Sequence, residues 1–378
     1  MCEVLSRARR IRTALLLSIM VWLGVALAAG PASAHDHGDA VYTQSNAVPN
    51  AIQAYKLHRG ALTPVGSFAT GGNGDPASAP FAPSGAVSLH ASGHALFTIN
   101  EGSNTVSSFR VRRDSSLELA SHVPSGGVFP TSVTSSGNLV YVVNSGDGTI
   151  SGFTVSHRTG ELTPIAGSTT ALASPAAPAQ ISFDATGRVL VVTERGTNVI
   201  ETFRLRRDGR PGAPTPQAST GQVPYGFAFT RRDVMVVSDA GMGLTDGTVS
   251  SYVLNGRTGQ ITAVDHHATG QGAPCWVSIT EDGRFAYVSN AFSSNVSQIA
   301  LARNGAMTVL GLTPVSGFAL DNAVDDDSDV FYVLTVDAMM PTSARIDALR
   351  IDRRGGGLTP IASTSAMLSP SATGLAAG

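Results

Sequence analysis

The sequence predicts an all-β fold in which seven four-stranded antiparallel sheets form a closed ring. Three observations lead to this prediction. A unit of two extended runs around a Gly/Asn/Asp turn recurs along the chain. The runs are of strand length, alternate in polarity and are rich in β-branched and aromatic residues. Each end of the chain holds only part of a unit, so that the two ends together would complete one.

The repeat has a regular spacing. Its copies include "LFTINEGSNTVSSFRV", "VYVVNSGDGTISGFTV" and "LVVTERGTNVIETFRL". One large residue late in the second run marks each copy: Tyr55, Phe109, Phe153, Phe203, Tyr252, Ile299 and Leu349. Further extended runs before and after each pair, such as "PYGFAFT" and "ELTPIAGST", bring the number of strands in a unit to four. Units of about 50 residues with four strands are typical of β-propeller blades.

The two chain ends predict how the ring closes. The N-terminal run "AVYTQSN" corresponds to the second strand of a unit, and "SPSATGLAAG" corresponds to the first strand. We therefore expect the C-terminal strand to pair with three N-terminal strands, which hides two strand edges. Residues 41–378 are predicted to form one seven-bladed domain. The stretches "GGNGDPASAPFAPSG" and "GRPGAPTPQASTGQ" are predicted to be loops between blades.

The N-terminal segment, residues 1–34, is predicted to be a secretory signal. Four arginines precede an apolar run at 13–29, and the small residues Ala32 and Ala34 fit a cleavage site. An uncleaved membrane anchor is the alternative. Cleavage would leave a short tail, 35–40, and a secreted protein. The sequence His35-Asp36-His37 at the new N-terminus could then bind copper or nickel, and an unstructured tail is the alternative.

Composition limits the partners of the chain. Without its signal the protein is mildly acidic, so nucleic acid is not an expected partner, and neither is a membrane. Only Cys275 would remain, which excludes an intramolecular disulfide, and we expect an inert buried thiol. The sequence has no glycine-rich phosphate motif and no His/Cys zinc motif, so no cofactor is expected. We expect a monomer.

Several motifs resemble a known family. The Gly-x-Leu-Thr-Pro tail, the "DATGRVLVVTE" and "EDGRFAYVSN" hairpins and the predicted ring closure are similar to the seven-bladed lactonase family, which includes bacterial 6-phosphogluconolactonase and fungal carboxymuconate cyclase. The resemblance covers nearly everything after residue 40. It implies hydrolysis of a cyclic ester. The elements "YVSN" and "YVVN" are also similar to the YVTN-type repeats of surface-associated propellers.

The candidate catalytic residues are Glu194, Arg195 and Asp239. Sites in propellers lie where loops converge over the central channel, which directs attention to residues just after each second strand. Lactone opening needs a base for water and a positive group for the oxyanion, and Glu194 and Arg195 supply these two types. The resemblance implies that Glu194 and Asp239 match a family Glu and Asp. The candidate substrate-binding residues are Gln180, Glu101, Asn144, Asn290 and Tyr225. Turn capping is the alternative for the asparagines.

Three departures from the family pattern leave the function open. Ala179-Gln180 stands where the family has Arg-His, Ala240 replaces an Arg, and another family His is replaced within "FPTSVT". One hypothesis is an exported hydrolase of a non-phosphorylated sugar or aromatic-acid lactone, with Gln180 in support of the catalytic residues. The other is a non-enzymatic propeller that binds a cell-surface or extracellular partner. The acidic run "DNAVDDDSDVF" is predicted to be a solvated hairpin, with a calcium site as the alternative.

Overall fold

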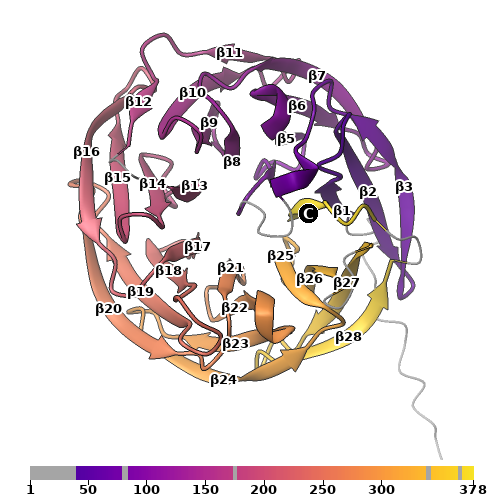
Figure 1. Ribbon diagram of the computed structural model, residues 1–378, viewed down its shortest axis with the longest axis vertical. Helices are drawn as coiled ribbons and strands as arrows, with labels where there is room; N and C mark the ends of the chain where they lie inside the picture. The colour runs from indigo at the N-terminus through magenta and orange to yellow at the C-terminus, as the bar shows by residue number, and fades with distance from the viewer. Residues whose placement is uncertain (1–39, 79–83, 173–176, 338–341, 365–367) are drawn as a thin grey trace, which may run out of the picture. The chain divides into compact units, whose positions relative to one another are not determined.

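The computed structural model describes residues 40–78, 84–172, 177–337, 342–364 and 368–378. In these ranges, seven antiparallel sheets are arranged in a ring around a central channel, as predicted (Figure 1). The predicted signal 1–34 and the tripeptide His35-Asp36-His37 lie outside the described residues. The described helices are three 3₁₀ turns of three residues each, and no helix among them is long and apolar enough to cross a membrane.

Each blade has four strands in order from the channel outward, and the blades are numbered here by their innermost strands. The innermost strands are β4 (Val87–Leu89), β8 (Pro130–Ser136), β13 (Pro178–Phe183), β17 (Pro224–Phe229), β21 (Pro274–Ile279), β25 (Phe318–Val324) and β29 (Thr373–Ala377). The second strands are β5 (Ala95–Asn100), β9 (Leu139–Asn144), β14 (Val189–Glu194), β18 (Val234–Asp239), β22 (Phe285–Asn290), β26 (Val330–Val336) and β1 (Ala40–Gln44).

The two outer strands of each blade follow in the same order. The third strands are β6 (Thr105–Val111), β10 (Thr149–Val155), β15 (Val199–Leu205), β19 (Thr248–Leu254), β23 (Asn295–Leu301), β27 (Ala344–Ile351) and β2 (Ala51–His58). The fourth strands are β7 (Leu117–Pro124), β11 (Leu162–Pro164) with β12 (Thr170–Ala171), β16 (Pro211–Ala218), β20 (Ile261–Ala268), β24 (Met307–Pro314), β28 (Leu358–Ser363) and β3 (Ala61–Ala69).

The seventh blade confirms the predicted ring closure. Its strand order is β29-β1-β2-β3, so the last strand of the chain is the innermost strand of the sheet that the N-terminal strands begin. Tyr42 in β1 pairs with Ala376 in β29, and the backbone of Ala40 exchanges two hydrogen bonds with Gly378, at 2.9 and 3.1 Å. In Figure 1 the C-terminus lies beside β1. Backbone hydrogen bonds therefore join the two ends of the ring.

The outermost strands correct one prediction. The stretch "GRPGAPTPQASTGQ" was expected to be a loop, but it contains β16, the fourth strand of blade three. Pro214 pairs with Phe203, and Pro216 pairs with Glu201. Proline is tolerated here because an outermost strand has a free edge, where a missing backbone N–H breaks no ladder. In blade two the fourth strand is divided into β11 and β12, both paired with β10.

The core consists of apolar clusters between neighbouring blades. One cluster joins Phe97 of blade one to Val140 and Phe153 of blade two, and all three side chains are buried. Tyrosines of second strands add polar ties between blades, because the Tyr287 hydroxyl donates to the Gly356 carbonyl at 3.1 Å. This packing follows from strand alternation, which directs successive side chains to the two faces of each blade.

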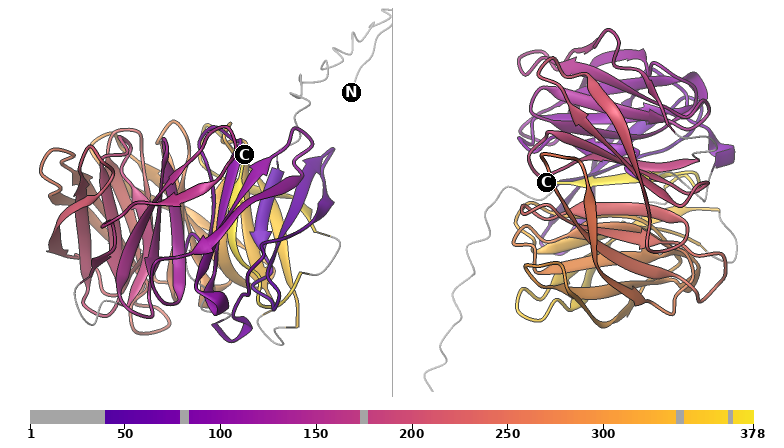
Figure 2. Two further views of the ribbon diagram at one scale, coloured as in Figure 1. Left: turned by 90° about the horizontal axis from the view of Figure 1, so that it is seen from above. Right: turned by 90° about the vertical axis from the view of Figure 1, so that its left-hand side faces the viewer.

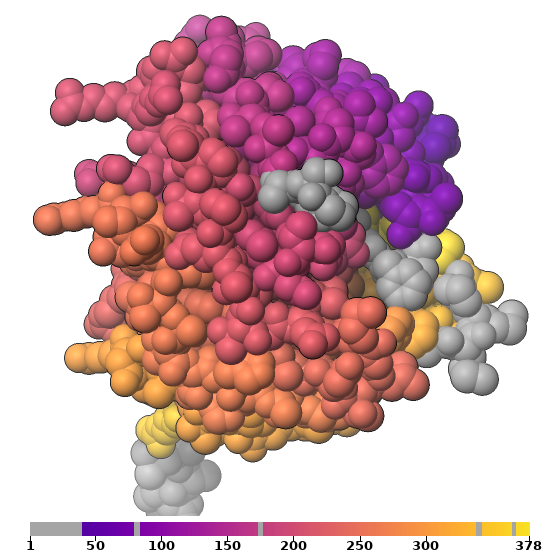
Figure 3. Space-filling view, turned by 60° about the vertical axis from the view of Figure 1, so that its left-hand side comes forward, coloured from indigo at the N-terminus to yellow at the C-terminus, as the bar shows by residue number. Residues whose placement is uncertain are grey.

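The ring has two different ends, which Figure 2 shows from the side. At one end, called the channel-mouth face, each second strand turns into the third and each fourth strand leads to the next blade. At the other end, called the opposite face, first strands turn into second strands and third strands into fourth strands. Pairing of Asn100 with Thr105 at one end, and of Ala95 with Arg110 at the other, fixes this arrangement in blade one. In Figure 3 long side chains project from one edge of the ring.

Replacing Gly374 by alanine should weaken the ring closure. Gly374 has a φ of +73°, and an added Cβ would lie 2.8 Å from the backbone nitrogen of Val87. An alanine at this position would be strained by its left-handed backbone and would clash with the backbone of Val87. Together these effects should lower the free energy of unfolding by about 2 to 4 kcal/mol, which chemical denaturation would measure. Gly311→Ala is the control, because no atom lies within 4 Å of its added Cβ, and it should change stability by less than about 0.5 kcal/mol. Equal losses in both variants would contradict the expected strain.

Candidate functional site

A pocket of about 240 Å³ opens on the channel-mouth face, where blades three to six meet. Two kinds of position form it: residues that directly follow second strands, such as Arg195 and Ala240, and residues near the start of first strands, such as Tyr225. Its walls are mostly apolar or aromatic. The lining residues are Arg195, Val223, Tyr225, Ala240, Gly241, Met242, Gly243, Ala273, Cys275, Trp276, Ala291, Phe292, Phe318 and Leu320.

Arg195 is the cation of this pocket. Its guanidinium carbon lies 5.1 Å from the centre of the Tyr225 ring, a distance typical of a cation–π contact. Its Nε donates to the Ala177 carbonyl at 3.3 Å. The Tyr225 ring in turn meets Trp276 edge to face, at 5.7 Å between ring centres. Among the described residues, no protein hydrogen bond or ion pair is made by the two terminal guanidinium nitrogens, so they are available to a ligand anion.

The other titratable groups of the lining are neutral at neutral pH. Burial raises the pKa of Tyr225, and the nearby Cys275, Asp321 and Glu101 raise it further, against the effect of Arg195. Burial also raises the pKa of the Cys275 thiol to about 12, which fits the inert thiol predicted from the sequence. Arg195 is therefore the charged group among the described lining residues.

Glu101 directly follows its second strand, the same position that Arg195 has in blade three. Its carboxyl group is buried, and its Oε2 accepts hydrogen bonds from the Ser78 hydroxyl at 2.6 Å and from the Asn46 amide at 3.1 Å. Oε1 has no hydrogen-bond partner among the described residues. Burial raises the pKa of Glu101 to about 7, and the hydrogen bonds from Ser78 and Asn46 oppose that shift. Because it follows a second strand, Glu101 lies at the channel-mouth face, but it is not among the residues that line the pocket.

Asp321 is a buried carboxyl group that the sequence did not suggest. It lies on β25, and it accepts backbone hydrogen bonds from Asn322 at 2.8 Å and from Leu375 at 3.2 Å. Burial raises its pKa to about 7. The segment "DNAVDDDSDVF" forms the predicted hairpin, between β25 and β26, but its first residues are buried in an innermost strand and are not solvated. Polar residues in this strand conceal the alternation that identifies a buried strand.

The structure places Glu194 and Asp239 inside the blades and not in the pocket lining. Glu194 is fully buried, and its Oε2 accepts a hydrogen bond from the Thr197 hydroxyl at 2.8 Å. Asp239 accepts from Ser250 at 2.5 Å and from Thr248 at 3.2 Å, both on the neighbouring strand β19. Burial raises the pKa of Asp239 to about 6. Of the three predicted catalytic residues, only Arg195 therefore lines the pocket.

The predicted amide ligands make contacts within and between blades. Asn290 donates to Ser297 at 2.8 Å, and Asn144 donates to Thr149 at 3.2 Å, each across to the third strand of its own blade. Gln180 accepts a hydrogen bond from the Phe227 N–H at 2.8 Å and donates to its carbonyl at 2.9 Å. Gln180 thereby ties blade three to blade four. Tyr225 is the predicted binding residue that the structure brings into the pocket with Arg195.

Three of the four aromatic residues of the pocket were missed from the sequence. Trp276, Phe292 and Phe318 lie close to the start of a first strand or just after a second strand. Apolar residues at such positions have the same pattern as core residues. Trp276 stands two residues after Pro274, and Phe292 stands two residues after the strand-ending Asn290, whereas no such signal marks Phe318.

A comparison with protein families identifies the chain. The family described as "Lactonase, 7-bladed beta-propeller" matches residues 33–176 and 234–312, which is more than half of the sequence. The chain belongs to this lactonase family. A search of the curated proteins finds no match.

Solved structures of similar fold extend over nearly the whole chain. The periplasmic gluconolactonase of Pseudomonas aeruginosa has a TM-score of 0.69 and 16% identity, over 90% of this chain and 98% of that one. A candidate 6-phosphogluconolactonase of Bacteroides fragilis has a TM-score of 0.67 and 16% identity, over 88% and 99% of the two chains. At this identity the two structures show the shared fold.

The buried carboxyl groups should make stability depend on pH. Asp321 keeps its proton in the folded chain up to about pH 7 but loses it near pH 4 when unfolded. The unfolded state therefore binds fewer protons between these values, and the free energy of unfolding should fall as pH rises, by up to about 1.4 kcal/mol per pH unit for this group. Asp321→Asn should flatten the slope measured by denaturation between pH 5 and 7. The exposed Asp246→Asn is the control, and an unchanged slope in Asp321→Asn would contradict this assignment.

Proposed function

We propose that the pocket beside Arg195 hydrolyses a small lactone that carries a carboxylate on an aromatic or unsaturated body. Membership of the lactonase family supports opening of a cyclic ester. The observation that carries the proposal is the guanidinium of Arg195 over the ring of Tyr225, in an otherwise apolar pocket. A planar cation with free donors suits a carboxylate, and apolar walls suit a flat ring.

The pocket chemistry favours an aromatic-acid lactone over a sugar lactone. A sugar ring has several hydroxyl groups, each of which needs a hydrogen-bond partner when it is buried. The walls offer Trp276, Phe292, Phe318 and Leu320 instead. A phosphate group would bring close to two negative charges into a site that holds one guanidinium and has Glu101 and Asp321 nearby. The proposed substrate is therefore not phosphorylated.

The reaction requires a base, and Glu101 is the proposed one. Its pKa of about 7 allows it to accept a proton from water near neutral pH, and its Oε1 is free of protein hydrogen bonds within the described residues. The water oxygen bonds to the lactone carbonyl carbon while its proton moves to Glu101. Arg195 stabilises the negative charge that develops on the carbonyl oxygen of the lactone. The ring C–O bond then breaks, and the leaving oxygen takes up the proton.

Glu194, the base proposed from the sequence, is the rival for this role. It directly precedes Arg195, and its Oε1 also lacks a hydrogen-bond partner among the described residues. Both carboxyl groups are buried and neither is among the residues that line the pocket, so burial and position do not separate them. Glu101 is preferred because its pKa of about 7 suits a general base near neutral pH. In this proposal Asp239 and Gln180 support the site indirectly, by holding the strands that carry the lining residues.

Export is part of the proposal. The arginines and the apolar run of residues 1–34 have the pattern of a secretory signal. A protein of similar fold, the gluconolactonase of Pseudomonas aeruginosa, is described as periplasmic. An extracytoplasmic location also fits a substrate without phosphate.

One feature of the rim supports the non-enzymatic alternative. Met242 and Leu244 are 81% and 70% exposed, and Phe292 is 40% exposed. Clustered exposed apolar side chains are common where a protein binds a partner. An extracellular partner that covers this rim would use the same face without any hydrolysis.

A panel of carboxylated aromatic and sugar lactones tests the activity. We expect Arg195→Gln to lower kcat/KM by about 100- to 1,000-fold, because it removes the cation of the site. Glu101→Gln should lower kcat by about 100-fold or more and should remove a rise in rate with pH near 7.

The controls separate the two bases and the two functions. Asp147→Asn removes an exposed carboxylate from the same face and should leave hydrolysis unchanged. Loss of activity in Glu194→Gln with full activity in Glu101→Gln would assign the base to Glu194. Absence of hydrolysis for every lactone in the wild-type protein would favour the partner-binding alternative.

A further inference from the structure

The charged residues are distributed unequally between the two ends of the ring. All described arginines except Arg195 and Arg345 lie near the opposite face, in turns or at the strand ends beside them. Buried carboxyl groups such as Glu101 and Asp239 lie toward the channel mouth. The opposite face is therefore the end where anions would be attracted.

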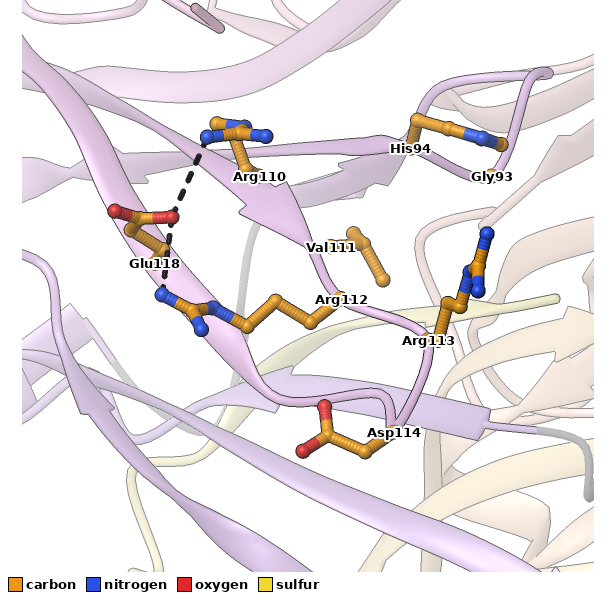
Figure 4. Close-up of a pocket in the computed structure, with 8 residues that line it drawn as sticks. All are labelled: Gly93, His94, Arg110, Val111, Arg112, Arg113, Asp114 and Glu118. Carbon is orange, nitrogen blue, oxygen red and sulfur yellow. Dashed lines mark ion pairs between the residues drawn. The ribbon is translucent and has the colours of Figure 1, made fainter.

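A groove on the opposite face crosses blades one and two. Two hollows of about 990 and 320 Å³ share His94, Arg110 and Val111, so they are continuous. Figure 4 shows the larger one, between the turn at Gly93–His94 and the turn that carries Arg112 to Asp114. The basic groove is defined by Arg110, Arg112, Arg113, Arg158, His94 and His157.

The acidic residues of this region leave part of the positive charge uncompensated. Two acidic residues line the groove: Glu118 pairs with both Arg110, at 3.6 Å, and Arg112, at 3.2 Å, and Asp114 accepts a hydrogen bond from the Ser116 hydroxyl and interacts with Arg112. In Figure 4, Arg113 points away from Glu118. Arg113 and Arg158 are exposed, and neither has an ion pair among the described residues. Their guanidinium groups are free to bind an external anion.

In the turns of other blades, aspartates stand beside arginines such as Arg188, Arg231 and Arg284 and offset part of their positive charge. In blades three to six the turn after the first strand contains an aspartate, namely Asp184, Asp233, Asp282 and Asp325. Blade six adds Asp326, Asp327 and Asp329 in the same turn. In blade one the corresponding turn contains His90 and His94 instead. An anionic ligand is therefore attracted to blades one and two and repelled by the turns of blade six.

We propose that the basic groove binds a linear polyanion, specifically an acidic polysaccharide. The planar guanidinium groups of Arg113 and Arg158 suit the carboxylate or sulfate groups of such a chain. A groove that runs across two blades matches an extended ligand with repeated charges. A flat anionic membrane fits less well, because it would also meet the aspartates of the other blades. This binding does not depend on lactone hydrolysis, since the pocket and the groove lie at opposite ends of the ring.

Binding of oligogalacturonate and of heparin fragments to the full chain tests the proposal. We expect both to bind at low ionic strength, with an affinity that falls as salt is added. The double variant Arg113→Ala, Arg158→Ala should raise Kd by at least about tenfold, because two unpaired cations of the groove are lost. Both side chains are exposed, so folding should be retained, as circular dichroism would verify; the milder Arg113→Gln gives a second measurement.

The control variant separates the groove from a general attraction to the face. Arg257→Ala, Arg303→Ala removes two arginines from equivalent turns of blades four and five, and it should change Kd less than twofold. Equal weakening in both double variants would overturn the groove as a site. Binding to vesicles with anionic lipid or to single-stranded DNA, without binding to the oligosaccharides, would overturn the assignment of the ligand.

Discussion

Backbone pairing between the last strand and the first strand is the constraint on which the rest of the structure depends. The hydrogen bonds between β29 and β1 complete the seventh sheet and close the ring. Without them, the innermost strands would have no fixed arrangement around the channel. The site residues come from five different blades: Arg195, Tyr225, Trp276 and Phe318 with Glu101 nearby. Their positions are set by closure, because no single blade contains the site.

The fold followed from the sequence because it is repetitive. Seven copies of one pattern predicted the blades, and the incomplete ends predicted the closure. The proline-rich β16 was mistaken for a loop because its edge position, which makes proline acceptable, is a property of the assembled sheet. The division of the fourth strand in blade two was likewise invisible in the sequence.

The candidate site followed from the sequence only in part. Arg195 and Tyr225 were expected and line the pocket, whereas Glu194 and Asp239 were expected but point into the blades. Adjacent residues at a strand end face opposite sides, and one sequence cannot tell which side faces the channel. Asp321 was missed because a buried aspartate on an innermost strand has the same sequence pattern as a turn.

The prolines of β16 affect how copies of the protein can associate. This strand forms the outer edge of blade three, and Pro214 and Pro216 have no backbone N–H to offer a passing chain. A strand from another copy would find an interrupted row of donors there, and sheet-to-sheet growth from this edge is disfavoured. The prolines that made this strand hard to recognise in the sequence therefore also disfavour fibrous self-association of the protein at high concentration.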